Sequence, residues 1–168
     1  LMEGISQEAI SFAAHIGLGK LIVLFDDNGI SIDGPTSLST SDDHLIRFQA
    51  SNWHTLECDG HSPSETEEAI NKAIADPRPS LIACKTKIGF GSPNKEGKSS
   101  SHGSPMGKEE IELIRKELNW SHAPFVIPAN ILDAWNNNGI KGKTERESWQ
   151  KIYNTSNYND EINDAISG

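Results

Sequence analysis

The sequence predicts an α/β fold in which a doubly wound parallel sheet carries helices on both faces. Segments with helical periodicity alternate with short apolar runs typical of strands. The first run, Leu21-Ile22-Val23-Leu24-Phe25, is continuously apolar. Such a run indicates a strand buried on both faces of a parallel sheet. Polar, Gly-rich loops over 26–40 and 87–106 follow two of the runs, where ligands of open α/β sheets bind.

Two helices are expected around the first strand. Residues 5–16 place apolar side chains on one helical face. A second helix is expected over 41–51, with Ser41 or Asp42 as its N-cap.

A strand–helix–strand unit then completes the predicted sheet. Residues 53–58 read as a strand, and residues 64–75 read as a helix opened by a capping box between Ser64 and Glu67. Residues 80–86 form the third strand. Because helices alternate with the strands along the chain, a parallel sheet with right-handed crossovers is expected.

The remainder of the chain has a different character. Helices are expected over 108–118, 129–137 and 144–154, and the Asn-rich end over 155–168 is expected to fray.

Composition excludes several classes of function. The chain has 168 residues, and its formal net charge of -9 argues against a nucleic-acid partner or an anionic membrane surface. It has no apolar run of the roughly 20 residues needed to cross a bilayer.

The opening residues lack the features of a signal peptide, so a cytoplasmic location is expected. The chain begins with Leu1 rather than Met, which suggests a piece of a longer reading frame. Cys58 and Cys84 lie in apolar, strand-like surroundings and are expected to be reduced core residues.

The two polar loops carry the candidate chemistry. Asp26-Asp27-Asn28-Gly29 offers hard oxygen ligands for Mg²⁺ or Ca²⁺, although the same residue types are common in any tight turn. The second loop combines glycines with small hydroxyl side chains and Lys95, a composition that allows close approach to an anion. His102 is a candidate acid or base, or else a solvated bystander.

Several strings in this chain together resemble the transketolase family. They occur in the order and at the approximate spacing of that family, and the resemblance extends over about residues 1–138. The strings are Leu-Met-Glu-Gly-Ile-Ser at 1–6, Phe-Asp-Asp-Asn-Gly-Ile-Ser-Ile-Asp-Gly at 25–34, Cys-Lys-Thr at 84–86, Ile-Gly-Phe-Gly-Ser-Pro-Asn-Lys at 88–95 and Ser-His-Gly-Ser-Pro-Met-Gly at 101–107.

The resemblance implies a thiamine-diphosphate-binding fold, here incomplete, with a divalent cation, Mg²⁺ or Ca²⁺, at the diphosphate. Asn28 and the main-chain carbonyl of Ile30 match metal ligands, and Asn28 counts also as a cofactor-binding residue. His102 matches a histidine that reaches the cofactor and substrate and takes part in proton transfer, and Ile88 matches an apolar residue beside the cofactor. The Gly-Asp-Gly string that opens the family's motif would lie immediately before Leu1.

The resemblance also implies partners and an activity. Glu3 and Glu8 match carboxylates at the family's homodimer interface. The implied reaction transfers a two-carbon ketol unit from a ketose phosphate to an aldose phosphate, as in the pentose phosphate pathway. Residues 1–138 would form part of the cofactor domain, and residues 139–168 a helical linker toward a missing pyrimidine-binding domain. The isolated chain is expected to be inactive. The alternative is a non-catalytic split or degenerate subunit that acts by association.

Overall fold

A computed structural model describes residues 4–168 and divides into two compact units. One unit ends at Trp120, and the other spans Ser121–Gly168.

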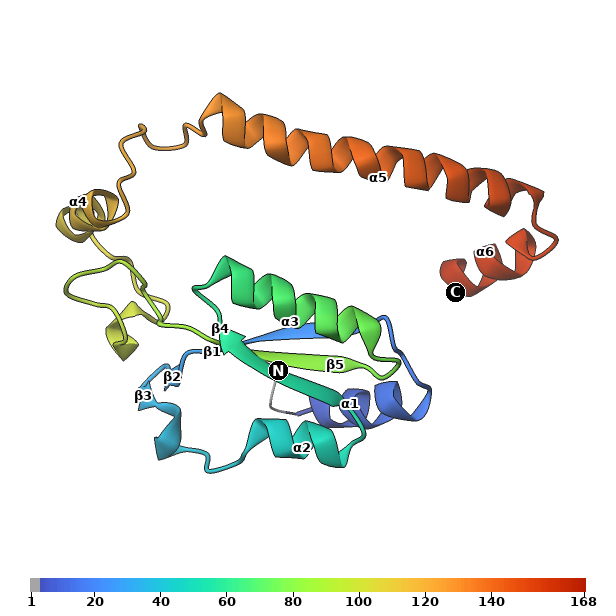
Figure 1. The fold of residues 1–168 in the computed structure, drawn as a ribbon, viewed down its shortest axis with the longest axis horizontal. Helices are drawn as coiled ribbons and strands as arrows, with labels where there is room; N and C mark the ends of the chain where they lie inside the picture. Colours follow the sequence, from blue (N-terminus) through green and yellow to red (C-terminus); the bar gives the residue numbers. More distant parts are fainter. Residues whose placement is uncertain (1–3) are drawn as a thin grey trace. The chain divides into compact units, whose positions relative to one another are not determined.

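The first unit contains a three-stranded parallel sheet, as the sequence predicts. Its strands are β1 (Ile22–Asp27), β4 (His54–Asp59) and β5 (Ser80–Lys85), in the order β1-β5-β4. Asp27 and Asp59, the last residues of the outer strands, both lie opposite Lys85 of the central strand. The three carboxyl ends therefore lie level at one edge of the sheet (Figure 1).

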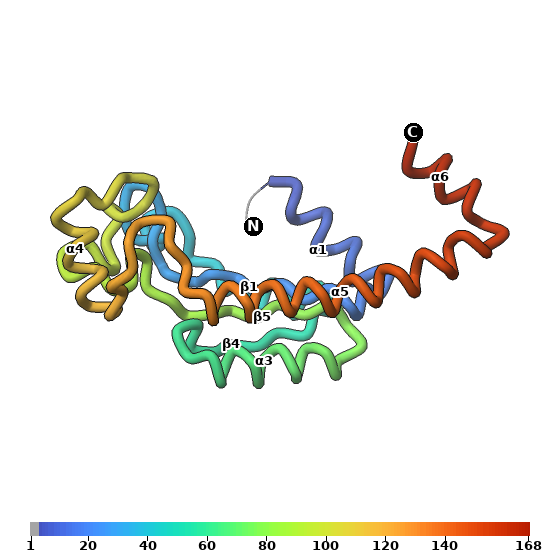
Figure 2. Tube along the Cα trace, turned by 90° about the horizontal axis from the view of Figure 1, so that it is seen from above, coloured from blue at the N-terminus to red at the C-terminus, as the bar shows by residue number. Residues whose placement is uncertain are grey.

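Helices cover both faces of this sheet. They are α1 (Ser6–His15), α2 (His44–Ala50) and α3 (Pro63–Ala75), with α1 and α3 on opposite sides of the strands (Figure 2). The neighbours Leu81 and Ile82 are fully buried, and because strand side chains alternate they point into different layers. Each layer has its own core, formed by Ile10, Ala13, Phe48, Trp53 and Leu81 on one face and by Cys58, Ala69, Ala73, Ile82 and Cys84 on the other.

The expectation that the run 21–25 is buried on both faces is wrong. β1 is an outer strand of the described sheet, and Leu24 is 51% exposed. Leu24 points to the face of α3, which packs mainly on β4 and β5. The strand buried on both faces is β5, because it has a strand on each side and a core on each face.

Two helix starts differ from the predicted ones. α2 begins at His44, and its N-cap is Asp43, whose carboxylate accepts the amide of Ile46. α3 begins at Pro63, and its N-cap is Ser62 rather than Ser64. Proline is favoured in the first helical turn because its missing N–H would have no partner there.

Short elements connect the main ones. β2 (Ile30–Ser31) and β3 (Gly34–Pro35) form a small antiparallel hairpin after β1, followed by a 3₁₀ turn at Thr36–Leu38. After β5, a long loop containing a 3₁₀ turn at Ser99–Ser101 leads into α4 (Lys108–Glu117). The sequence analysis predicted α4 but none of the short elements.

The second unit contains α5 (Ala129–Thr155) and α6 (Asn159–Ser167). α5 is one continuous helix, so the prediction of separate helices over 129–137 and 144–154 is wrong. Gly139 and Gly142 lie inside it; each costs about 1 kcal/mol relative to Ala but does not by itself end a helix. The frayed end expected after residue 155 is also wrong, because α6 forms there. The domain boundary proposed at residue 138 stays a prediction.

No helix in the described part, residues 4–168, has both the length and the apolar character needed to cross a membrane.

Candidate functional site

The candidate site is the set of turns at the carboxyl ends of β1, β4 and β5. Asp26 and Asp27 end β1, Asp59 ends β4, and Lys85 ends β5. This edge is where ligands bind in open parallel sheets. The register of the strands, rather than any local motif, brings the three turns together.

Two contacts tie the end of β5 to the end of β1. The Lys85 ammonium donates to a carboxylate oxygen of Asp27, and it lies 3.4 Å from Glu57 on β4. The Thr86 hydroxyl donates to Asp26. The hydrogen bond to Asp27 raises the pKa of the Lys85 ammonium, so Lys85 stays charged and offsets the two carboxylates of β1.

Asn28 closes the turn that follows β1. Its Oδ1 accepts the Ile30 amide at 3.0 Å, and Gly29 takes the left-handed backbone conformation. The Gly29 carbonyl accepts the Thr36 amide at 2.9 Å, which holds the β2–β3 hairpin against the turn. Asn28 is half-buried, so this amide has a defined position at the edge of the sheet.

The oxygen atoms of this turn fit a hard cation in part. An amide oxygen has two lone pairs, and the Ile30 amide occupies one of those on Asn28. Ile30 and Pro35 form a non-hydrogen-bonded pair of the hairpin, because the neighbouring ladder bond runs from the Thr36 amide to the Gly29 carbonyl, so the Ile30 carbonyl points away from β3. Oxygen atoms at both positions of the predicted metal site can therefore accept a cation. Among residues 4–168 no cluster of three or more His, Cys, Asp or Glu side chains offers a complete site.

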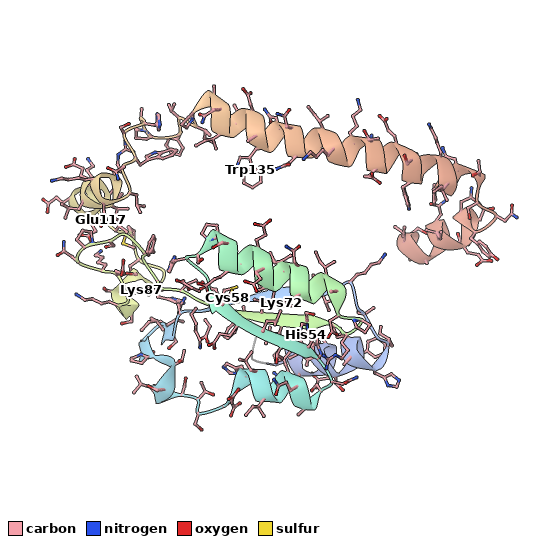
Figure 3. All side chains as sticks on the ribbon, in the orientation of Figure 1. His54, Cys58, Lys72, Lys87, Glu117 and Trp135 are labelled. Carbon is pink, nitrogen blue, oxygen red and sulfur yellow. The ribbon has the colours of Figure 1, made fainter. Side chains whose placement is uncertain are left out.

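His61 connects the end of β4 to the loop after β5. Its Nε2 accepts the Lys87 amide at 2.9 Å, and its ring stacks on Phe90 with a centroid distance of 4.0 Å. An accepting Nε2 requires the other ring nitrogen, Nδ1, to carry the proton of the neutral ring. Figure 3 shows Lys87 where the chain leaves β5. No local pattern in the sequence gives His61 a role, because its partners are distant in sequence.

The loop after β5 is held by its own hydrogen bonds. The Gly97 amide donates to the Ile88 carbonyl at 2.8 Å, and the Gly91 amide donates to Glu96 at 2.9 Å. Gly89 has a left-handed conformation, and a Cβ there would lie 2.7 Å from Oγ of Ser101. Only glycine meets both constraints, which accounts for this glycine of the Gly-Phe-Gly string.

A buried carboxylate anchors the same loop to α4. Glu110 is 7% exposed and accepts the Ser92 hydroxyl, the Asn94 amide at 2.9 Å and the Asn94 side chain at 2.8 Å. These hydrogen bonds, that from Ser92 first, lower the pKa of the Glu110 carboxyl. Lys95 extends the anchor by donating to the Met106 carbonyl at 3.1 Å. No local pattern marks Glu110, because its partners Ser92 and Asn94 lie on the preceding loop.

The structure places the predicted site residues at separate points. Asn28 and Ile30 share the turn after β1, Ile88 is half-buried at the start of the loop, and His102 is exposed at the loop's far end. Within residues 4–168, neither a hydrogen bond nor an ion pair joins His102 to Asn28. Glu8 is exposed on α1, and Glu3 lies outside the described residues. The roles of these residues stay predictions.

Comparison with known proteins gives one consistent result. The family model described as "Transketolase, thiamine diphosphate binding domain" matches residues 1–165, further than the 138 residues over which the resemblance was read. The chain is 53% identical over 150 residues to a transketolase of Cereibacter sphaeroides and 51% identical over 156 residues to transketolase 2 of Escherichia coli. These alignments cover 89% and 91% of the chain, but it spans only 23% of either relative.

Solved structures agree with the sequence comparisons. A transketolase of Campylobacter jejuni superposes with a TM-score of 0.88 at 30% identity, over 96% of this chain and 26% of that one. A Pichia stipitis transketolase in complex with sedoheptulose 7-phosphate gives a TM-score of 0.83 at 31% identity, over 90% of this chain and 23% of that one.

Proposed function

This chain belongs to the transketolase family, and we propose that it supplies the cation turn and the His102 loop of a longer enzyme that transfers a two-carbon ketol unit. The donor would be a ketose phosphate and the acceptor an aldose phosphate, as in the pentose phosphate pathway. The sugar phosphate bound by the Pichia stipitis relative supports this substrate class. The observation that carries the proposal is the turn of Asn28 and Ile30 at the carboxyl edge of the sheet.

The first role of this chain is to hold the cation of the cofactor. Oδ1 of Asn28 and the carbonyl of Ile30 would bind Mg²⁺ or Ca²⁺, which prefer oxygen ligands. Because one lone pair of Asn28 is fixed by the Ile30 amide, the side chain is oriented before the cation arrives. A dication also favours carboxylate ligands, so we propose that an Asp elsewhere in the complete enzyme finishes the set.

The second role is to orient cofactor and substrate through the loop after β5. Thiamine diphosphate, when bound, supplies the nucleophilic carbon and the electron sink of ketol transfer. Ile88 would contact the cofactor, and the exposed His102 would hydrogen-bond the diphosphate and hold or release a proton near the sugar. The contacts of Glu110 and His61 fix both ends of the segment that carries Ile88.

The proposed setting of the enzyme is a homodimer in the cytoplasm. Glu3 and Glu8, near the start of the chain, would lie at the dimer interface. Glu8 is exposed on α1, as an interface residue of a separate protomer should be.

The test is the variant Asn28→Ala in the full-length protein. Titration with thiamine diphosphate at fixed Mg²⁺ should show a Kd raised on the order of tenfold or more, the scale found for groups that support a metal site. Asn28→Asp keeps an oxygen that can accept the Ile30 amide and bind the cation, so it should lose much less.

A matched control is Asn71→Ala, because Asn71 is an exposed asparagine on α3. Its Kd should equal that of the wild type. Ketol transfer from sedoheptulose 7-phosphate should fall with cofactor affinity in Asn28→Ala and be unaffected in Asn71→Ala. An unchanged Kd and Mg²⁺ requirement in Asn28→Ala would contradict the metal role. A full-length protein that binds the cofactor but transfers no ketol unit would favour the non-catalytic alternative.

A further inference from the structure

The two cysteines of the chain are neighbours on adjacent strands. Cys58 of β4 and Cys84 of β5 are register partners, and their sulfur atoms lie 3.8 Å apart as free thiols. Both side chains are buried, at 7% and 8% exposure, in the core beneath α3. Figure 3 shows Cys58 on β4, close to the edge of the sheet that carries the site.

We propose that Cys58 and Cys84 form an oxidisable dithiol, which a low-molecular-weight disulfide converts into a disulfide bond between β4 and β5. The spacing of paired strands, about 4.8 Å, lies within the range of Cα separations that a disulfide spans, about 4.4–6.8 Å. The sulfur atoms must approach from 3.8 Å to about 2.05 Å. That closure of about 1.8 Å needs a rotamer change or a small strand shift, not an unfolding of the sheet.

The reaction takes two balanced steps. The thiolate of one cysteine attacks a sulfur of the small disulfide, which forms a mixed disulfide and releases one small thiolate. The second cysteine then loses its proton, and its thiolate attacks the protein sulfur of the mixed disulfide, which releases a second small thiolate. Two protein thiols are oxidised, and one small disulfide is reduced to two thiols.

The surroundings of the pair determine the speed of this reaction. Burial, and next the hydrogen bond from Cys58, raise the pKa of the Cys84 thiol to about 11. The Cys84 thiolate is therefore scarce at neutral pH, and because both side chains are buried the first attack needs a local opening of the structure and is slow. Once a mixed disulfide has formed, the second thiol is already adjacent, so the intramolecular step should be the faster one.

Tryptic digestion separates the two cysteines and allows a direct test. Cleavage after Arg47, Lys72 and Lys85 gives Cys58 in peptide 48–72 and Cys84 in peptide 73–85, since Arg78 precedes a proline. The native full-length protein is incubated with oxidised glutathione, its remaining thiols are alkylated after denaturation, and it is digested without reduction. The expected product is peptides 48–72 and 73–85 linked by one disulfide, with a mass lower by two hydrogens than their sum.

Two further outcomes decide the proposal. In the Cys58→Ser variant the linked pair should vanish, and Cys84 should appear alkylated or glutathionylated. If wild-type Cys58 and Cys84 are both recovered alkylated, or as stable glutathione adducts, after prolonged exposure to the oxidant, the pair is not a closable dithiol and the proposal fails.

Discussion

Gly60 lies where the chain leaves β4, and replacing it with Ala should loosen the site. Its amide donates to the Lys85 carbonyl at 2.8 Å. A Cβ at this position would lie 2.5 Å from Cγ2 of Thr86, 3.0 Å from Cβ of Cys84 and 3.2 Å from the carbonyl oxygen of Lys85. Gly60 does not have a left-handed backbone, so the cost arises from crowding and not from backbone strain.

The size of the effect follows from this crowding. A methyl group forced into a packed region costs about 1–3 kcal/mol. The group that can move away is the Thr86 side chain, and its movement breaks the hydrogen bond to Asp26. A local stability lowered by this amount speeds hydrogen exchange through local opening by about 5- to 150-fold.

The assay is hydrogen exchange by mass spectrometry on the full-length protein. The reporters are the amides of Gly60 and Lys87, which donate to Lys85 and His61 across the strand ends. Both should exchange faster in Gly60→Ala. Exchange rates within twofold of the wild type at both amides would refute the reasoning, because they would mean that the Thr86 side chain moves aside without lowering the local stability.

The same chemical change elsewhere provides the control. Gly142 lies within α5, where a Cβ has no atom within 4 Å and the backbone is helical. Gly142→Ala should stabilise the helix by up to about 1 kcal/mol. It should leave the exchange of Gly60 and Lys87 unchanged.

Three further changes test the packing and the electrostatics of the first unit. Hydrogen bonds from Arg78 hold the pKa of the Asp76 carboxyl well below its ordinary value. The stability that this group contributes is therefore present above about pH 4 and is lost as the pH falls further. Asp76→Asn should lower the thermal midpoint at pH 7, and it should reduce the fall of that midpoint below pH 4. Glu110→Gln replaces one acceptor oxygen with an NH₂ that faces donors. Limited proteolysis should therefore cut within residues 88–106 sooner than in the wild type. Equal cleavage rates would contradict the role of Glu110 in anchoring the loop to α4. Trp53→Phe leaves the Ile10 carbonyl without its buried indole donor at 2.9 Å. The free energy of unfolding should fall by about 1–3 kcal/mol, which would appear as a lower urea midpoint. An unchanged midpoint would count against this bond.

The local sequence pattern was sufficient to predict the three strands of the sheet, because each strand can be recognised from the residues within it. The runs ending at Phe25 and Cys84 are mainly apolar, whereas the run ending at Cys58 mixes apolar with polar residues. Parallel order follows from helical crossovers. Pattern did not distinguish a central strand from an outer one, since Leu24 looks as buried in the sequence as Ile82. The strand order, which sets that difference, depends on contacts between distant segments.

The misplaced helix boundaries have local causes. Ser62 and Ser64 each have a glutamate three residues later, so the capping-box pattern fits both. Pro63 decides between them, because proline favours the first helical turn and α3 starts there. In α5, Gly139 and Gly142 fall between the two predicted helices, but a glycine penalty of about 1 kcal/mol each is small for a helix that continues on both sides.

The sequence allowed candidate site residues to be named, and their roles stay predictions, but it did not reveal the side chains that support them. Asn28, Ile30, Ile88 and His102 lie in strings that can be matched locally. The side chains that position those strings act across long sequence separations, as His61 does on Lys87 and Glu110 on Asn94. Each looks like an ordinary polar surface residue until the fold brings its partner near, and no local pattern carries that information.

These supports fix the position of the loop that carries the candidate residues Ile88 and His102. The loop that carries Ile88 and His102 leaves β5, and β5 is clamped on both sides at that point. Asp26 and Asp27 of β1 hold Thr86 and Lys85 from one side, while Gly60 and His61 after β4 hold Lys85 and Lys87 from the other. The turn of Asn28 and Ile30 begins at the same two aspartates, so a shift of β5 would move this turn and the loop together. The relative position of Asn28 and Ile88 therefore depends more on the register of the three strands than on either loop, and changes at the strand ends should weaken cofactor binding even where they touch no ligand.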